Sequence, residues 1–272
     1  MTLAVIAVVA GALIGLSLGA LGGGGSILAV PVLVYALDQS PLQATTGSLV
    51  VVGVSSVIGA VTAHQAGNLL LGRGITFGLV AVAGAAVGAK ASAHVDEGVL
   101  LAAFAVLMLM VAVLMVLRLV RGRNEHSVGP PTLDHPIITF SPTFICRCPK
   151  ALMVLVTATA VGLLTGFLGV GGGFLVVPAL VLALDLSMRH APGTSLVVMA
   201  ITSAVALGVR AGTGLQPDWG FVLLLTAASS VGVLVGARLA TLVDTRRLSQ
   251  AFTGLVLAVA VATASQALPA LV

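Results

Sequence analysis

The sequence contains two runs of small residues that could hold an anion, and the second run repeats the first. The first comprises Gly22, Gly24, Gly25 and Ser26, and the second comprises Gly169, Gly171, Gly172 and Gly173. A helix that begins at such a run presents unpaired N–H groups and the positive end of its dipole, which together attract an oxyanion. The alternative is close helix packing, which the four-residue spacing of Gly11, Gly15 and Gly19 favours. Both interpretations stay open for the glycine runs.

Hydroxyl groups and cations follow the glycine runs at equivalent places. Hydroxyls and guanidinium groups both donate hydrogen bonds to oxyanions, and a cation near membrane depth is costly enough to indicate a function. Besides the glycine runs, the predicted substrate site therefore contains Thr46, Ser48, Lys90, Thr194, Ser195 and Arg238. The competing explanation for the two cations is that their long side chains extend to the lipid headgroups. His64 and Arg210 also end apolar runs, and they rank below Lys90 and Arg238.

Helix capping competes with ligand binding for the polar residues that precede these hydroxyls. Ser40 stands directly before Pro41, which is typical of a helix N-cap followed by its first residue. Asp185 or Ser187 is expected to cap the equivalent helix of the second run. We interpret Ser40 and Asp185 as caps.

Other kinds of site have no support in the sequence. There is no Ser/His/Asp triad, no HExxH zinc helix and no carboxylate clearly inside an apolar segment. Cys146 and Cys148 are too few for a disulfide framework or a structural zinc site. The cations lack aromatic neighbours, which argues against nucleic-acid binding. We therefore expect no enzyme activity, no cofactor and no metal site.

The elements that position these residues must lie in a membrane. The chain has 272 residues, of which 59% are hydrophobic and only 7% are charged, whereas soluble domains carry about 25% charged residues. The apolar segments lack the alternation of a transmembrane β-barrel. The fold class that remains is an all-α polytopic membrane protein.

An internal repeat divides the chain. Residues 19–50 align without a gap to residues 166–197, and 18 of the 32 positions are identical. The predicted units are a first transmembrane repeat (1–120), a polar linker that contains prolines (121–150) and a second transmembrane repeat (151–272). The apolar runs are 3–37, 43–63, 75–93 and 98–120 in the first repeat and 151–184, 193–209, 220–240 and 248–268 in the second.

The first apolar run of each repeat must be broken. A straight helix of 35 residues would be roughly 52 Å long, which exceeds the bilayer core, and glycines and a proline (Pro31 or Pro178) interrupt each run. If each broken run turns back, as a re-entrant helix pair followed by three transmembrane helices, the repeats are inverted. Ten of the 12 Lys and Arg residues then lie on one side, against a split of 7 to 5 for parallel repeats. We predict inverted repeats, a cytoplasmic linker and periplasmic termini.

Each repeat contains, in the same order, a glycine cluster, a proline (Pro31 or Pro178), the stretch LDQSPLQATTGSLVV or LDLSMRHAPGTSLVV, and the stretch GAKASAHVD or GARLATLVD. This repeated order of motifs resembles the sulfite exporter TauE/SafE family. The resemblance covers essentially the whole chain. It implies a secondary transporter of the bacterial inner membrane that exports sulfite or a related sulfur-containing anion or organosulfonate. We expect alternating access between the repeats around one central oxyanion. Import, a non-transporting membrane scaffold and a homodimer stay open as alternatives.

Overall fold

The computed structural model describes most of both repeats. The described residues are 2–92, 94–96, 98–99, 103, 106–107, 109–110, 113, 148–169, 173–184, 186–187, 189–211, 217–242, 250 and 254. Most of the predicted linker, most of the last apolar run of each repeat, and Gly171, Gly172, Asp185 and Cys146 lie outside this part of the chain.

The described secondary structure is helical throughout. The first half contains α1 (Thr2–Leu21), α2 (Ser26–Pro31), the π-helical turn η1 (Val32–Ala36), α3 (Pro41–Gln65) and α4 (Leu71–Ser92). The second half contains α6 (Cys148–Leu168), α7 (Gly173–Ala183), α8 (Ala191–Arg210) and α9 (Trp219–Leu242). In the described residues, α1, α3, α4, α8 and α9 contain segments long and apolar enough to cross a bilayer. The prediction of a helical membrane protein is confirmed.

Glycines break both long apolar runs, and the prolines do not. Gly22 and Gly169, which are equivalent in the repeat, have φ of 75° and 65° and stand directly after α1 and α6. Glycine adopts this left-handed conformation without a Cβ clash. Pro178 lies inside α7, so the expectation that it interrupts the run is wrong. After Pro31 the α-helix changes to π-helical turns, so the chain stays helical to Ala36.

The two caps differ from each other. Ser40 is the N-cap of α3 and its side chain accepts a hydrogen bond from the backbone N–H of Gln43 at 3.4 Å, as predicted. Ser187 does not cap α8, because that helix begins at Ala191 with His190 as its N-cap. The Ser187 hydroxyl contacts the His190 ring instead, with 2.9 Å between Oγ and Nδ1.

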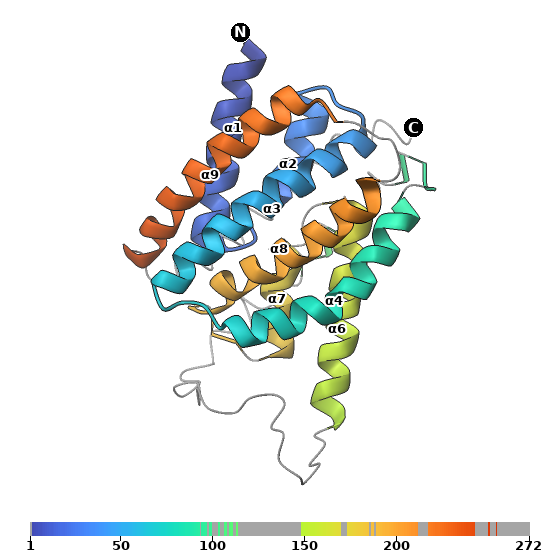
Figure 1. Cartoon of the computed structure of the whole chain (residues 1–272), viewed down its shortest axis with the longest axis vertical. Helices are drawn as coiled ribbons and strands as arrows, with labels where there is room; N and C mark the ends of the chain where they lie inside the picture. The colour runs from blue at the N-terminus through green and yellow to red at the C-terminus, as the bar shows by residue number, and fades with distance from the viewer. Residues whose placement is uncertain are drawn as a thin grey trace.

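Helices α3 and α8 form the centre of the molecule and run antiparallel (Figure 1). Gly59 faces Leu196 and Gly53 faces Ser203, so the residue numbers on one helix fall as those on the other rise. These two helices are also the most deeply buried of the long apolar helices. They are therefore placed to bring the polar residues of both halves together.

The outer helices pair across the halves. α1 packs along α9, and α4 packs along α6 (Figure 1). Both contacts depend on glycine: a Cβ at Gly15 would overlap the backbone of Ser229, and a Cβ at Gly84 would overlap the backbone of Thr159. Missing side chains let helix backbones approach closely, as in GxxxG contacts within membranes.

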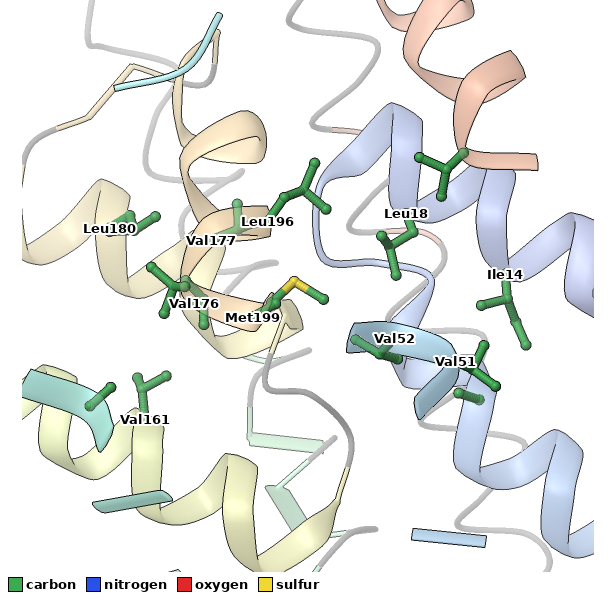
Figure 2. Packing of buried hydrophobic residues seen from close by; sticks show 14 of the residues in the cluster. Ile14, Leu18, Val51, Val52, Val161, Val176, Val177, Leu180, Leu196 and Met199 are labelled. Carbon is green, nitrogen blue, oxygen red and sulfur yellow. The ribbon is translucent and has the colours of Figure 1, made fainter. Parts of the chain in front are cut away.

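The buried core extends from the central pair to the short helices and to the inner faces of the outer helices. It contains Val51 and Val52 of α3, Val176 and Val177 of α7, and Met199 of α8. In the view of Figure 2, the Met199 side chain lies between the labelled side chains of Val176 and Val52. Large apolar side chains on the outer helices, such as Leu79, Val87 and Val231, remain exposed. An apolar outer surface fits contact with lipid.

Candidate functional site

The two glycine turns meet inside the molecule. A Cβ at Gly173, the first residue of α7, would lie 2.8 Å from Cα of Gly23, in the turn that precedes α2. At the same point it would come within 2.5 Å of the sulfur of Met199. The starts of α2 and α7 therefore approach each other beside α8, and glycine is what permits this approach.

Each glycine turn also packs against the central helix of the other half. Gly22 lies against Pro192 at the start of α8, and Gly169 lies against Thr45 at the start of α3. Pro192 and Thr45 occupy equivalent positions in the repeat, 147 residues apart. Gly169 is held further by Ser48, whose hydroxyl donates to the Gly169 carbonyl oxygen. The chain therefore anchors each turn through residues of the opposite half.

Two repeat-equivalent hydroxyls, those of Ser56 and Ser203, lie buried on the central helices. Neither has a hydrogen-bond partner in the described part of the chain, and both serines are 1% exposed or less. Ser203 lies one helical turn from Met199 on α8. A buried polar group without a partner costs free energy, so such groups stand out as binding candidates.

The predicted hydroxyls are buried and bonded within the protein. Ser26 donates to the Gly23 carbonyl at 2.7 Å, which ties down the first turn of α2. Thr46 and Ser195 donate to carbonyls of their own helices. Thr194 accepts a hydrogen bond from the backbone N–H of Leu70 at 3.2 Å, so it joins α8 to the loop before α4. The structure brings Ser48 to a glycine turn and spreads the others over both ends of the α3–α8 pair.

The predicted cations lie elsewhere. The side chains of Lys90 on α4 and Arg238 on α9 are both exposed. Among the Lys and Arg residues whose burial the structure describes, the buried one is Arg210, at the end of α8, and its side chain is 3% exposed. Its guanidinium donates to the hydroxyls of Thr45 at 2.6 Å, Thr46 at 3.3 Å and Ser92 at 2.8 Å, and to the carbonyl of Gly166 at 3.0 Å.

Sequence reasoning ranked Arg210 below Lys90 and Arg238 and did not single out Ser92. Arg210 ends an apolar helix, which is also where a cation that extends to the headgroups would stand. The Thr45–Thr46 pair is the signal that could have identified Arg210. Because α3 and α8 run antiparallel, these threonines lie level with the end of α8.

A second group of basic residues lies at the opposite end of α8. Arg189 donates from Nε to the amide oxygen of Asn68 at 3.1 Å, across the two halves. The neighbouring His190 is partly buried. Its pKa is lowered from the ordinary value of 6.5 by this burial and by the positive charges of Arg189 and Arg73.

Among the described residues, no group of three or more His, Cys, Asp or Glu side chains could hold a metal ion. The polar groups that the fold gathers are hydroxyls, backbone groups and a guanidinium. All of these can donate hydrogen bonds except the carbonyls, so the arrangement suits an anion better than a cation.

Comparison with known proteins gives one family. The family model described as "Sulfite exporter TauE/SafE" matches residues 7–263. A "Probable membrane transporter protein" of Xylella fastidiosa (strain 9a5c) is 32% identical over 264 residues, which cover 94% of this chain and 93% of that protein. The "Probable membrane transporter protein YdhB" of Bacillus subtilis (strain 168) is 26% identical over 231 residues, which cover 85% of this chain and 87% of that protein. No solved structure matches. The chain therefore belongs to the sulfite exporter TauE/SafE family of membrane transporters.

Proposed function

We propose that this protein is a secondary transporter that exports sulfite, or a related sulfur-containing oxyanion or organosulfonate, across the bacterial inner membrane. The family supports an anion as the substrate. The observation that carries the proposal is the meeting of the two glycine turns, because it brings the starts of α2 and α7 together between the halves.

The proposed anion site lies at these turns. Backbone N–H groups at the start of α7, and in the turn before α2, supply donors without the cost of dehydrating a charged side chain. The buried hydroxyls of Ser56 and Ser203 lie on the helices that flank the turns and could donate to the anion. Gly171 and Gly172 belong to the proposed site by their place in the repeat. Lys90 on α4 and Arg238 on α9 stay candidates for substrate contacts outside the turns, because their side chains are exposed.

Alternating access would come from movement of one repeat against the other. What supports inverted repeats is that α3 and α8, which are equivalent in sequence, run antiparallel. Parallel repeats would require equivalent helices to cross the membrane in the same direction. Inverted repeats with discontinuous helices at the substrate site are a recurring plan among secondary transporters.

Sulfite flux in proteoliposomes tests the proposal. Vesicles that contain the purified protein and internal sulfite should lose sulfite with saturable kinetics, and protein-free vesicles should not. Thiosulfate and ethanesulfonate, added as competitors, rank the substrate classes. A potassium gradient with valinomycin sets the membrane potential, which acts on a transported anion. Correctly folded protein that moves none of these anions in either direction would leave the membrane scaffold as the better explanation.

The direction and the topology need separate measurements. Thiol labelling of Cys146 and Cys148 from one side of sealed vesicles reports where the linker lies, and a cytoplasmic linker is expected. The labelling also gives the orientation of the protein in the vesicle membrane. Sulfite flux measured in the same vesicles then distinguishes export from import.

A further inference from the structure

Arg210 brings a positive charge into the interior of a membrane protein. Its side chain is 3% exposed, although it stands at the last residue of α8. An arginine that only extended to the headgroups would leave its guanidinium accessible at the end of the helix. Ionisable groups inside membrane proteins are costly, and they mark substrate or ion pathways.

The hydrogen bonds of the guanidinium to Thr45, Thr46, Ser92 and Gly166 all end on neutral oxygens, from α3, α4 and α6. A hydrogen bond from the guanidinium to a neutral oxygen lacks the attraction between opposite charges that an oxyanion adds, and this attraction is strong inside a protein. The planar guanidinium also presents paired N–H groups that match two oxygens of one anion. An oxyanion that reaches Arg210 can therefore displace these neutral acceptors.

The hydroxyls keep a partner when the guanidinium leaves them. The hydroxyls of Thr45 and Thr46 both donate to the Leu42 carbonyl, and that of Ser92 donates to the Ala89 carbonyl at 2.9 Å. Release of Arg210 therefore leaves no hydroxyl hydrogen without an acceptor. The exchange of neutral acceptors for an anion costs less than breaking a network whose members depend on each other.

The arrangement exists in one half only. The positions equivalent to Thr45 and Thr46 are Pro192 and Gly193, which have no side-chain oxygen. His64, the near-equivalent of Arg210, is exposed. A group that served only to fasten the two repeats would be expected at both ends of the antiparallel pair. Among the described residues, a buried cation at one end alone instead suits a ligand that passes through once.

We propose that the Arg210 guanidinium binds the transported oxyanion directly, and that Thr45, Thr46 and Ser92 hold it in place until the anion displaces them. The inference rests on the proposed function and adds a named cation to it. In this structure the guanidinium is enclosed, so the bound state requires the packing around the end of α8 to open.

The test uses the full-length protein purified in detergent, with sulfite as the ligand. The variants are Arg210→Gln, Arg210→Lys and, as the matched control, His64→Gln. Isothermal titration at constant ionic strength gives the sulfite Kd, and thermal unfolding without ligand reports the fold. We expect Arg210→Gln to weaken sulfite binding by about tenfold or more. Arg210→Lys should fall between that variant and the parent, and His64→Gln should match the parent.

The outcomes separate this inference from the proposed function. If the parent transports sulfite and folded Arg210→Gln binds it with the parent Kd, the inference is wrong and the proposed function stands. If the parent neither binds nor moves any sulfur anion, both are wrong. A panel of thiosulfate, ethanesulfonate and acetate shows whether Arg210 acts on sulfur oxyanions or on carboxylates too.

A second pair of variants decides the matter if Arg210→Gln does not fold. Thr45→Val keeps the shape of the side chain but removes the oxygen that lies 2.6 Å from the guanidinium. Because the anion must displace this hydrogen bond, its loss should strengthen sulfite binding by about threefold or more. Thr45→Ser should restore the parent affinity. Parent affinity in Thr45→Val would contradict the inference.

Discussion

Glycines with positive φ differ in what surrounds them. Gly22 and Gly67 have φ of 75° and 68°, but a Cβ at Gly22 would overlap Pro192, whereas nothing lies within 4 Å of a Cβ at Gly67. Gly67→Ala therefore measures the backbone cost alone, about 1 kcal/mol. Gly22→Ala adds a clash with the backbone of α8, which cannot move aside as a side chain can.

We expect Gly22→Ala to lower the melting temperature clearly more than Gly67→Ala, and to lower the yield of folded protein. Thermal unfolding of both variants in the same detergent checks this. Equal losses would show that the close contact between Gly22 and Pro192 does not matter to stability.

The partly buried His190 predicts a pH dependence of stability. Because its folded pKa is lowered, the unfolded chain takes up a proton at a higher pH than the folded protein does. Stability should therefore fall as the pH decreases through the window below 6.5, and should be independent of this group above it. His190→Gln should flatten the slope of melting temperature between about pH 7.5 and about pH 5.5.

Arg189→Gln serves as the comparison for His190. It removes one neighbouring positive charge but leaves the burial of the ring, which is the larger cause of the shift. Its slope should lie between those of the parent and His190→Gln. A slope in His190→Gln as steep as in the parent would assign the pH dependence to other groups.

The burial of single site residues could not be predicted from the sequence. Equivalence in the repeat favours Lys90 and Arg238, and their binding role stays a prediction. The burial of Arg210 depends on α3, α4 and α6 closing around it, and the spacing of residues along α8 does not carry that information. The repeat also gives no signal for Arg210. The positions equivalent to its partners Thr45 and Thr46 are Pro192 and Gly193, which have no hydroxyl group.

The bounds of single helices were easier to predict than the helices against which they pack. The apolar runs 43–63 and 193–209 correspond to α3 (Pro41–Gln65) and α8 (Ala191–Arg210) within two residues at each end. The glycine breaks were also predictable, since a run too long for the bilayer must end where the helix propensity is lowest. Small-residue spacing identified the packing face of α1, but it could not identify α9 as the helix on that face.

The contact of α1 with α9 makes a prediction about glycines in helices. A Cβ at Gly15 would overlap the carbonyl of Ser229, whereas Gly208 on α8 has nothing within 4 Å and is exposed. Gly15→Ala should destabilise the protein because the two backbones must move apart. Gly208→Ala should be neutral or raise stability by up to about 1 kcal/mol, since alanine is the better helix former.

Thermal unfolding of the two variants gives the comparison, and Gly72→Ala adds a second open position. If Gly15→Ala is as stable as Gly208→Ala, the α1–α9 contact does not hold the bundle together. The same substitution at Gly84 tests the equivalent contact between α4 and α6.

At the scale of the whole molecule, the two halves are not separate domains in the described structure. α1 of the first half packs on α9 of the second, and α6 of the second packs on α4 of the first. The sequence repeat indicates two units by ancestry, but these contacts bury the glycine faces of α1 and α6 against helices of the other half. Repeat boundaries therefore do not predict independently folding units.

This arrangement predicts the behaviour of a chain cut in its linker. Fragments 1–120 and 151–272, expressed together with different affinity tags, should purify as one complex, because each supplies the helix on which the other packs. Either fragment expressed alone should aggregate or be degraded, since the glycine faces of α1 and α4 or of α6 and α9 would lack their partners. Size-exclusion chromatography and copurification provide the measurement. A monodisperse fragment 1–120 on its own would show instead that the first half folds without α6 and α9, and that the contacts across the halves form only after folding.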